Sequence, residues 1–228
     1  MLPWLIAIPL AYLAGAIPFG VLIARAKGVD ITKHGSKNTG ATNVGRVLGF
    51  RFFLLCFLLD MLKGLVPTLA AGLGAGVVGQ RDIAQTDAWL WLAVMASAVL
   101  GHMFSPFLSF KGGKGVATGL GALLGVFPIL TLAAAAAAIV WGLTFAIWRY
   151  VSLASIAAAI ALPIATAAAL FARLTSDAPL AALPFLSVTL ALAALVVFRH
   201  RTNVGRLLRG EEHRIGAPRP TPEDSPSA

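Results

Sequence analysis

The chain has 228 residues, of which 58% are hydrophobic and only 12% are charged, and its formal net charge at pH 7 is +9. Soluble domains contain about 45–50% apolar and about 25% charged residues, so this composition excludes an ordinary soluble protein. Long apolar runs separated by short polar segments predict a polytopic helical membrane protein, and the lack of strand-length alternation argues against a β-barrel.

Six apolar segments are long enough to form membrane helices. In chain order they are residues 2–24, 52–79, 89–110, 116–148, 151–171 and 180–198. The first segment has no preceding Lys or Arg, which a signal peptide would have, and it stays apolar up to Ala24. We therefore expect a transmembrane helix there and no cleaved leader.

Basic residues are concentrated in two of the polar segments, residues 25–51 and the tail from residue 199. By contrast, residues 80–88 and 173–179 each contain acidic side chains and a single Arg. Because Lys and Arg are retained on the cytoplasmic side of a membrane, the two basic segments are predicted to be cytoplasmic and the other two external.

This assignment makes Arg149 cytoplasmic as well, so residues 116–148 are expected to cross twice, as two short helices that turn near Pro128. The predicted fold is an all-α polytopic membrane protein with seven transmembrane helices. The N-terminus would be outside, the C-terminus in the cytoplasm, and the polar motifs on the cytoplasmic side. We expect one transmembrane domain over residues 1–213, followed by a Pro-rich disordered tail over residues 214–228.

The first polar motif, residues 35–49, reads GSKNTGATNVGRVLG. Small residues that expose backbone N–H groups, next to a guanidinium, can hold an anion. The same composition suits an ordinary interfacial loop with helix caps, and this segment alone does not separate the two possibilities. The candidate contact residues are Ser36, Asn38, Gly40, Thr42, Asn43 and Arg46.

The second motif, residues 110–118, reads FKGGKGVAT. It is not a nucleotide-hydrolase P-loop, because Gly115 stands where Ser or Thr is required and Leu108 where the first Gly should be. Glycines before a helix can still hold an anion with the help of the helix dipole. A cytoplasmic boundary would explain the lysines but not three glycines in four positions. The candidate residues are Lys111, Gly112, Gly113, Lys114, Gly115 and Thr118.

The third motif, residues 199–212, reads RHRTNVGRLLRGEE and follows the last apolar segment. His200 and Asn203 share one helical face, and Arg206 lies close to it. A His beside an Asn at a basic membrane edge can act as an acid or a base near neutral pH. A positive-inside stop signal would account for most of the arginines but not for His200 or Asn203.

Asp60 and Lys63 lie within an apolar segment, and their i,i+3 spacing allows them to pair and so neutralise an expensive burial. We interpret this pair as structural, and His102 as a residue that holds a helix end. The histidines are dispersed and Cys56 is alone, so we expect no metal site and no disulfide.

Together with LLDMLKG at residues 58–64, the three motifs resemble those of the bacterial acyl-phosphate-dependent glycerol-3-phosphate acyltransferases, in the same order from about residue 14 to residue 213. The resemblance implies a seven-helix enzyme of the bacterial inner membrane with its active site facing the cytoplasm. It would join acyl phosphate to the 1-position of glycerol 3-phosphate and release lysophosphatidic acid and phosphate, the first step of phospholipid synthesis.

The same resemblance implies partners and roles. The partners would be acyl phosphate, glycerol 3-phosphate and membrane lipid, with no nucleic acid, metal or cofactor. Ser36 and Arg46 would hold phosphate, residues 111–115 would form a phosphate loop, and Glu212 would be structural. The residues expected to be catalytic are Ser36, Arg46, Lys114, His200 and Asn203, and the other candidates, Arg206 among them, would bind substrate.

Acyl phosphate is already an activated mixed anhydride, so the enzyme needs positioning, charge neutralisation and a proton acceptor, but no covalent nucleophile. Arg46 and Lys114 would stabilise the leaving phosphate, and His200 would orient or polarise. The base is either His200 or a phosphate oxygen of a substrate. The rival functions are a transporter of a phosphorylated or anionic solute, a scaffold that binds anionic lipid, and an acyl phosphatase.

Overall fold

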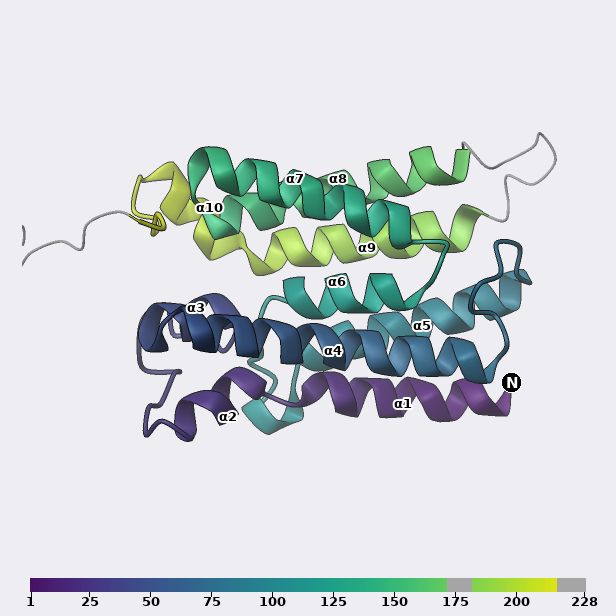
Figure 1. Ribbon diagram of the computed structural model, residues 1–228, viewed down its shortest axis with the longest axis horizontal. Coiled ribbons are helices and arrows are strands. Elements are labelled where there is room, and N and C mark those ends of the chain that lie inside the picture. The colour runs from purple at the N-terminus through teal and green to yellow at the C-terminus, as the bar shows by residue number, and fades with distance from the viewer. Residues whose placement is uncertain (172–181, 217–228) are drawn as a thin grey trace, which may run out of the picture.

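The computed structural model describes residues 1–171 and 182–216, and this part of the chain is helical throughout its regular structure (Figure 1). The predicted Pro-rich tail lies outside the described residues from residue 217 onward. The elements are α1 (Leu2–Ala16), α2 (Phe19–Arg25), α3 (Ala41–Leu48), α4 (Phe50–Gly74), α5 (Gln85–Met103), η1 (Pro106–Leu108), α6 (Val116–Gly125), α7 (Thr131–Trp148), α8 (Val151–Phe171), α9 (Leu183–Arg199) and α10 (Arg201–Leu208).

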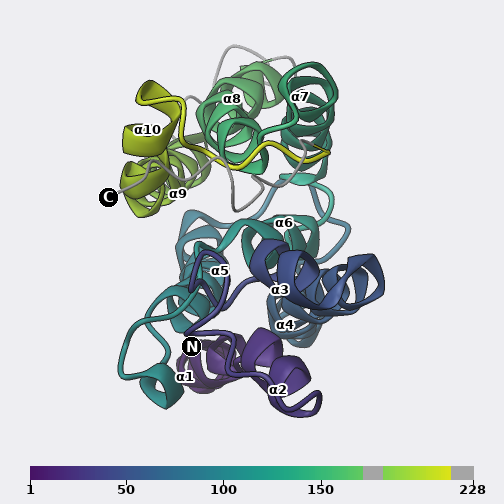
Figure 2. The same cartoon turned by 90° about the vertical axis from the view of Figure 1, so that its left-hand side faces the viewer.

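The helices form two groups that lie side by side along the long axis of the molecule. Figure 2 looks along this axis and shows α1 to α6 in one group and α7 to α10 in the other. Within the first group α1 packs against α5 and α4 against α6, and within the second α8 lies between α7 and α9. Contacts of α5 with α9 and of α6 with α7 join the groups.

Glycines allow the closest helix pairs in the first group. A Cβ added at Gly15 would lie 2.0 Å from the Ala98 carbonyl oxygen, and one at Gly101 would lie 2.1 Å from the Tyr12 carbonyl oxygen. Gly15 of α1 faces α5, and Gly101 of α5 faces α1. The backbones of the two helices therefore approach each other closely at both points. Small residues have this function in membrane bundles because apolar side chains gain little by leaving lipid, so close packing must supply the attraction.

Apolar side chains cover the outside of the bundle as well as its interior. α5 is the most buried candidate span, and its Trp91, Leu92 and Met95 are inaccessible. Large apolar residues on the outer helices, such as Val66 and Ile139, are exposed. Such a surface would be a liability in water but is stable against lipid acyl chains, as the composition predicted.

Five helical stretches have the length and composition of a membrane span, and six if α9 and α10, which meet at 55°, are taken together. This count of the described residues is lower than the seven crossings predicted. The difference lies in residues 116–148, which do divide near Pro128 but form an α6 of only 10 residues before α7. A helix needs about 17 residues or more to span a membrane by itself, and α6 begins well inside the bundle (Figure 1), so the helix alone does not have that length.

The first apolar segment also differs from the single helix predicted over residues 2–24. It is interrupted at Ile17 and Pro18, where Ile17 is extended and Pro18 has no N–H to donate. Two short helices, α1 and α2, therefore replace one long helix. The interruption leaves carbonyl groups that other elements must satisfy, because lipid offers no donors.

Candidate active site

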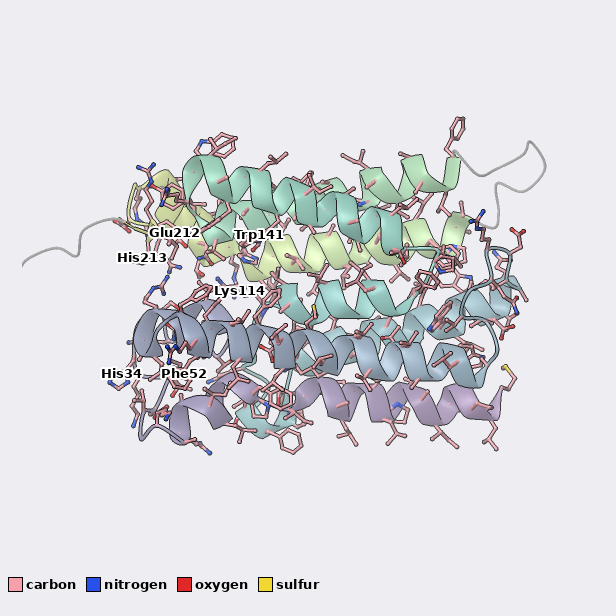
Figure 3. All side chains as sticks on the ribbon, in the orientation of Figure 1. His34, Phe52, Lys114, Trp141, Glu212 and His213 are labelled. Carbon is pink, nitrogen blue, oxygen red and sulfur yellow. The ribbon has the colours of Figure 1, made fainter. Side chains whose placement is uncertain are left out.

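The three polar motifs meet at one end of the bundle. Figure 3 shows Lys114, Glu212 and His213 close together at the end where α3 and α10 lie, with His34 at the same end. Lys114 comes from the loop before α6, and Glu212 and His213 follow α10. Segments that are distant in the sequence therefore contribute charged side chains to one region.

Glu212 is the acceptor around which this region is organised. Its Oε1 accepts hydrogen bonds from Asn203 Nδ2 at 2.7 Å and from Ser152 Oγ at 2.8 Å. Its Oε2 accepts one from Arg206 Nε at 2.7 Å. Lys114 Nζ donates to Asn203 Oδ1, so the network continues into the loop before α6. The carboxylate thus fixes side chains from α8 and α10 and, through Asn203, the lysine of the second motif.

These contacts stabilise the ionised form of Glu212. Burial alone would raise the pKa of Glu212, but hydrogen bonds from Arg206, Asn203 and Ser152 together hold it below its usual value. Glu212 is therefore an anion under all physiological conditions. Its role in the network agrees with the structural role that the resemblance implied. Ser152 was missed, because a serine in an apolar helix carries no indication of a carboxylate partner 60 residues away.

Lys114 sits in an environment that disfavours its charge. Burial lowers the pKa of Lys114 to about 8, with Glu212 opposing this shift and Arg206, Arg46 and Arg199 adding to it. The cations around Lys114 outnumber the one carboxylate that influences it among the described residues. Such an excess of partly desolvated positive charge attracts an anion, whose binding would relieve the repulsion.

Arg46 brings the first motif to the same region. It is half-buried on α3, and burial lowers its pKa, an effect that Glu212 opposes and Arg206 reinforces. The Nε of Arg46 is buried without a hydrogen-bond partner among the residues that the structure describes. A buried guanidinium donor without an acceptor is costly, so this group is suited to receive an anionic ligand.

His200 is 3% exposed and lies at the junction of α9 and α10. Its Nδ1 is 2.8 Å from the Val196 carbonyl oxygen. Because a carbonyl can only accept, Nδ1 carries the proton, and Nε2 of the neutral ring is left as an acceptor. The backbone of α9 thus selects the tautomer whose Nε2 carries no proton, which is the tautomer that a general base requires.

Asn43 organises the loop of the first motif. Its side chain is buried, and its Oδ1 accepts from the Ser36 amide at 2.8 Å. Its Nδ2 lies 2.8 Å from the Asn38 carbonyl oxygen and 3.0 Å from that of His34. Asn38 Oδ1 in turn accepts from the Gly40 amide at 2.9 Å. The two amide side chains therefore hold loop backbone rather than point outward.

Other candidates of this loop are closer to solvent. Ser36 is exposed, Thr42 is half-buried, and Gly40 caps α3 in an extended conformation. In the second motif Lys111 is exposed, whereas Thr118 is fully buried against Gly64 of α4. The structure therefore does not bring Ser36, Lys111 and Thr118 into the network around Glu212.

The glycines of the second motif are explained by packing. The Gly112 and Gly113 amides donate to the carbonyl oxygens of Met103 and His102, at 3.1 and 3.2 Å. Arg199 Nη2 donates to the carbonyl oxygens of Gly112 and Gly113 at 2.6 and 2.7 Å. A Cβ at Gly113 would lie 2.2 Å from His102 Nε2. These two amides are therefore engaged within the protein and are not open to an anion, contrary to the sequence-based interpretation of the loop.

The residues that follow these two glycines, Lys114 and Gly115, lead directly into α6. Gly115 has φ +79°, a left-handed conformation that favours glycine, and it is the N-cap residue of α6. The first amides of a helix have no partner within the helix, and Lys114 stands directly before them. Arg199, which the charge pattern assigned only to a cytoplasmic boundary, is the residue that clamps this loop from α9.

Comparison with known proteins gives a consistent result. The family model described as glycerol-3-phosphate acyltransferase matches residues 5–210. The glycerol-3-phosphate acyltransferase of Aquifex aeolicus (strain VF5) is 43% identical over 205 residues, which cover 90% of this chain and 95% of the relative. That of Geobacter sulfurreducens (strain ATCC 51573 / DSM 12127 / PCA) is 45% identical over 217 residues, 95% of this chain and the whole relative.

Two solved structures are also similar to this chain. Both are crystal structures of PlsY (YgiH), an integral membrane glycerol 3-phosphate acyltransferase. The glycerol 3-phosphate form has a TM-score of 0.78 at 42% identity and covers 93% of this chain and 96% of that chain. The lysophosphatidic acid form has a TM-score of 0.76 at 42% identity and covers 93% and 95%.

Proposed function

This chain belongs to the glycerol-3-phosphate acyltransferase family, and we propose that it transfers a fatty acyl group from acyl phosphate to the 1-hydroxyl of glycerol 3-phosphate. Membership of a family of acyltransferases supports an enzyme over a solute transporter. The glycerol 3-phosphate and lysophosphatidic acid named for the two crystal forms support this acceptor and this product.

The reaction needs no covalent intermediate. The hydroxyl oxygen of glycerol 3-phosphate attacks the acyl carbonyl carbon, the ester bond forms, and the bond from that carbon to the phosphate oxygen breaks. The hydroxyl proton passes to a base and the electron pair leaves with phosphate. Both substrates carry phosphate, so the site must bring two anions together. The cost of doing so is offset by positive charge that is already fixed in place.

The observation that carries this proposal is the group of cations from three motifs around Glu212. Lys114 and Arg46, the latter with a buried donor that lacks an acceptor in the described structure, are suited to stabilise the leaving phosphate. Asn203 positions Lys114, and Arg206 is held by Glu212. The free Nε2 of His200 is suited to accept the hydroxyl proton, and a phosphate oxygen of a substrate is the alternative base.

The remaining candidates complete the proposed phosphate contacts. Ser36, Thr42 and Lys111 lie near the surface, where a soluble substrate arrives. We assign Asn38, Gly40 and Asn43 to holding the first loop in shape, and Gly112, Gly113, Gly115 and Thr118 to placing Lys114. These assignments are tested by separating effects on KM from effects on kcat.

We also propose that the end of the bundle with the active site faces the cytoplasm of a bacterial inner membrane, with the N-terminus outside. This orientation needs an odd number of crossings, so the short α6 and the loop before it would together complete the seventh. The basic loop around Lys33 and the acidic segment around Asp82 would then lie on opposite sides. In a Cys56→Ala background, a membrane-impermeant maleimide should label Asp82→Cys but not Lys33→Cys in spheroplasts; the reverse result would invert the topology.

The activity is tested with detergent-purified protein and acyl phosphate, by following phosphate release with and without glycerol 3-phosphate. We expect release that requires glycerol 3-phosphate, with lysophosphatidic acid formed and no need for acyl-CoA. Equal release without the acceptor would indicate an acyl phosphatase instead.

The role of His200 is tested with His200→Gln. This variant should lose at least about tenfold in kcat, because base catalysis contributes about 100-fold or more. Near-full turnover would show that His200 takes no part in the reaction.

A further inference from the structure

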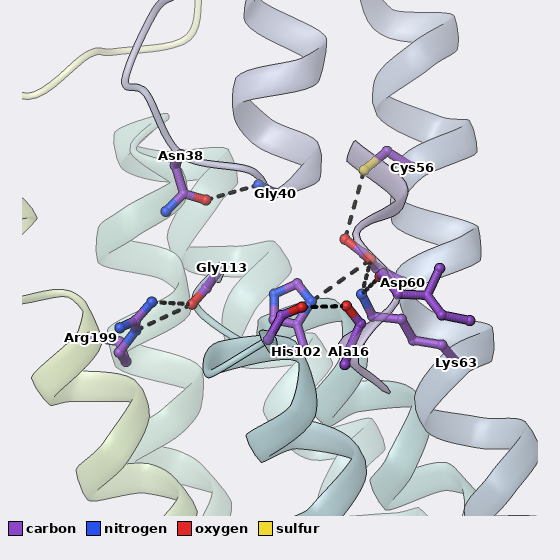
Figure 4. A network of polar contacts seen from close by, with 11 residues as sticks. Ala16, Asn38, Gly40, Cys56, Asp60, Lys63, His102, Gly113 and Arg199 are labelled. Atoms are coloured by element: carbon purple, nitrogen blue, oxygen red, sulfur yellow. Dashed lines mark hydrogen bonds and ion pairs between the residues drawn. The ribbon is translucent and has the colours of Figure 1, made fainter. Parts of the chain in front are cut away.

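Asp60 of α4, Lys63 of α4 and His102 of α5 form a buried polar cluster, called the Asp60 cluster here, that the proposed mechanism does not use. Lys63 Nζ lies 2.7 Å from Asp60 Oδ1, and both side chains are less than 5% exposed. This confirms the pairing predicted from their spacing. His102 Nδ1 faces the same carboxylate oxygen at 3.8 Å, and Cys56 Sγ lies 3.7 Å from Asp60 Oδ2 (Figure 4).

The Asp60 cluster reaches the interruption between α1 and α2. Lys63 Nζ donates to the Ile17 carbonyl oxygen at 2.7 Å, and Ser105 Oγ donates to that of Ala16 at 2.6 Å. Both carbonyl groups lie at the break between α1 and α2, where the bonding of one continuous helix is interrupted, and the Ile17 carbonyl oxygen also accepts the Phe19 amide at 3.1 Å. The lysine therefore forms an ion pair with Asp60 and a hydrogen bond to the backbone of the broken helix. Thr39 of the first motif lines the small pocket beside these groups.

The same cluster reaches the second motif through His102. The His102 carbonyl oxygen accepts the Gly113 amide, and the imidazole lies directly under the Gly113 backbone, because a Cβ there would be 2.2 Å from Nε2. On the opposite side Arg199 holds the Gly113 carbonyl oxygen (Figure 4). The loop is thus held between His102 and Arg199, one residue before Lys114.

We propose that Asp60, Lys63 and His102 are positioning residues for the phosphate-binding lysine. The Asp60 carboxylate faces, at 3.8 Å, the ring that supports Gly113, and Lys63 pairs with Asp60 while it ties the broken helix α1–α2 to α4. If Asp60 and Lys63 only neutralised each other's charge, the ion pair between them would be sufficient. The further contacts with Ile17 and His102 would not be needed. This inference rests on the proposed function, because it gives the loop its purpose.

The test separates charge neutralisation from positioning with Asp60→Asn, Lys63→Met and the double variant. Each single variant leaves a buried charge without its partner, so both stability and activity should fall. The double variant buries no charge, so its melting temperature should rise above that of either single variant, and the remaining deficit reflects the lost hydrogen bond to the Ile17 carbonyl oxygen. If the cluster positions the loop, kcat should stay about tenfold or more below normal, since a misplacement of about 1 Å costs up to about 100-fold. The KM for glycerol 3-phosphate should change much less.

A second measurement does not depend on activity. Hydrogen exchange of the amides of residues 104–115 should be faster in the double variant, because the acceptors of Gly112 and Gly113 are displaced. Thr68→Val, a buried change in α4 whose hydroxyl bonds only within that helix, is the matched control and should alter neither quantity. If the double variant does not fold, His102→Gln replaces it with the same expectations.

The outcomes are distinct. A double variant with normal kcat, or one with low kcat but unchanged exchange in residues 104–115, would overturn the positioning role. If the unmodified protein forms no lysophosphatidic acid, the proposed function fails by itself, while the exchange measurement still tests whether the Asp60 cluster holds the loop.

Discussion

The pKa of Lys114 leads to a specific pH dependence. The structure lowers the pKa of Lys114 from 10.5 to about 8, mainly because the ammonium is buried. Below this value Lys114 is charged and can bind phosphate; above it the charge is lost. We therefore expect kcat/KM, which reports on the free enzyme, to be independent of this group at pH 7 and to fall about tenfold per pH unit well above pH 8.

The size of the effect can be estimated from the same site. The lowering of the pKa corresponds to a penalty of about 3 kcal/mol on the charged lysine. An anion about 4 Å away at an effective dielectric constant of about 20 contributes roughly 4 kcal/mol in the opposite direction. Bound phosphate should therefore return the pKa of Lys114 toward its usual value. The alkaline fall in kcat should accordingly lie at higher pH than the fall in kcat/KM.

The assay is phosphate release between about pH 6 and 10, with parallel blanks for uncatalysed hydrolysis of acyl phosphate. The informative variant is Lys114→Arg, since a guanidinium stays charged throughout this range. Its rate should be lower, because the larger group fits the Asn203 contact poorly, but its alkaline fall near pH 8 should be gone. A variant that keeps the same midpoint near pH 8 would refute the assignment, because another group would then be titrating.

Three further substitutions test the architecture of the site. Glu212→Gln removes the negative charge that three hydrogen-bond donors contact, at a side chain that is only 8% exposed. It should lower the free energy of unfolding by about 2–4 kcal/mol and reduce kcat. An unchanged melting temperature would contradict its central role. Asn43→Ala removes the bonds that shape the first loop, so glycerol-3-phosphate-dependent turnover should fall and exchange of residues 31–40 should rise; protection equal to that of the unmodified protein would count against it. Gly113→Ala places a Cβ 2.2 Å from His102 Nε2, so kcat should fall at least about tenfold, whereas Gly142→Ala, which meets nothing within 4 Å, should leave it unchanged.

Much of the site could be predicted from local sequence because its chemistry is concentrated in short segments. Lys114, Asn203 and Arg206 lie in motifs whose charge and glycine content differ from the apolar chain around them, and the structure brings these residues together. Asp60 and Lys63 could be paired because their separation is one helical turn, a distance that does not depend on the rest of the fold.

The residues that sequence reasoning missed act over long separations. Ser152 lies in an apolar helix and contacts Glu212. Arg199 looks like one more positive charge at a membrane boundary but clamps the loop before Lys114. The glycines of that loop were expected to open amides to an anion, and the structure explains Gly112 and Gly113 by their contact with the end of α5. No local pattern distinguishes these cases, because the partner decides the role.

By itself the sequence determined that the chain is helical, lies in a membrane and carries three polar motifs rich in positive charge. These properties follow from hydrophobic transfer, backbone hydrogen bonding and charge, which depend on composition and short spacings. Only the tertiary structure decided that the first helix breaks at Pro18, that α6 has only 10 residues, and that Lys63 contacts the break while His102 lies against the loop. Such features depend on which carbonyl group meets which side chain across the bundle, and that information is present only when the helices are packed.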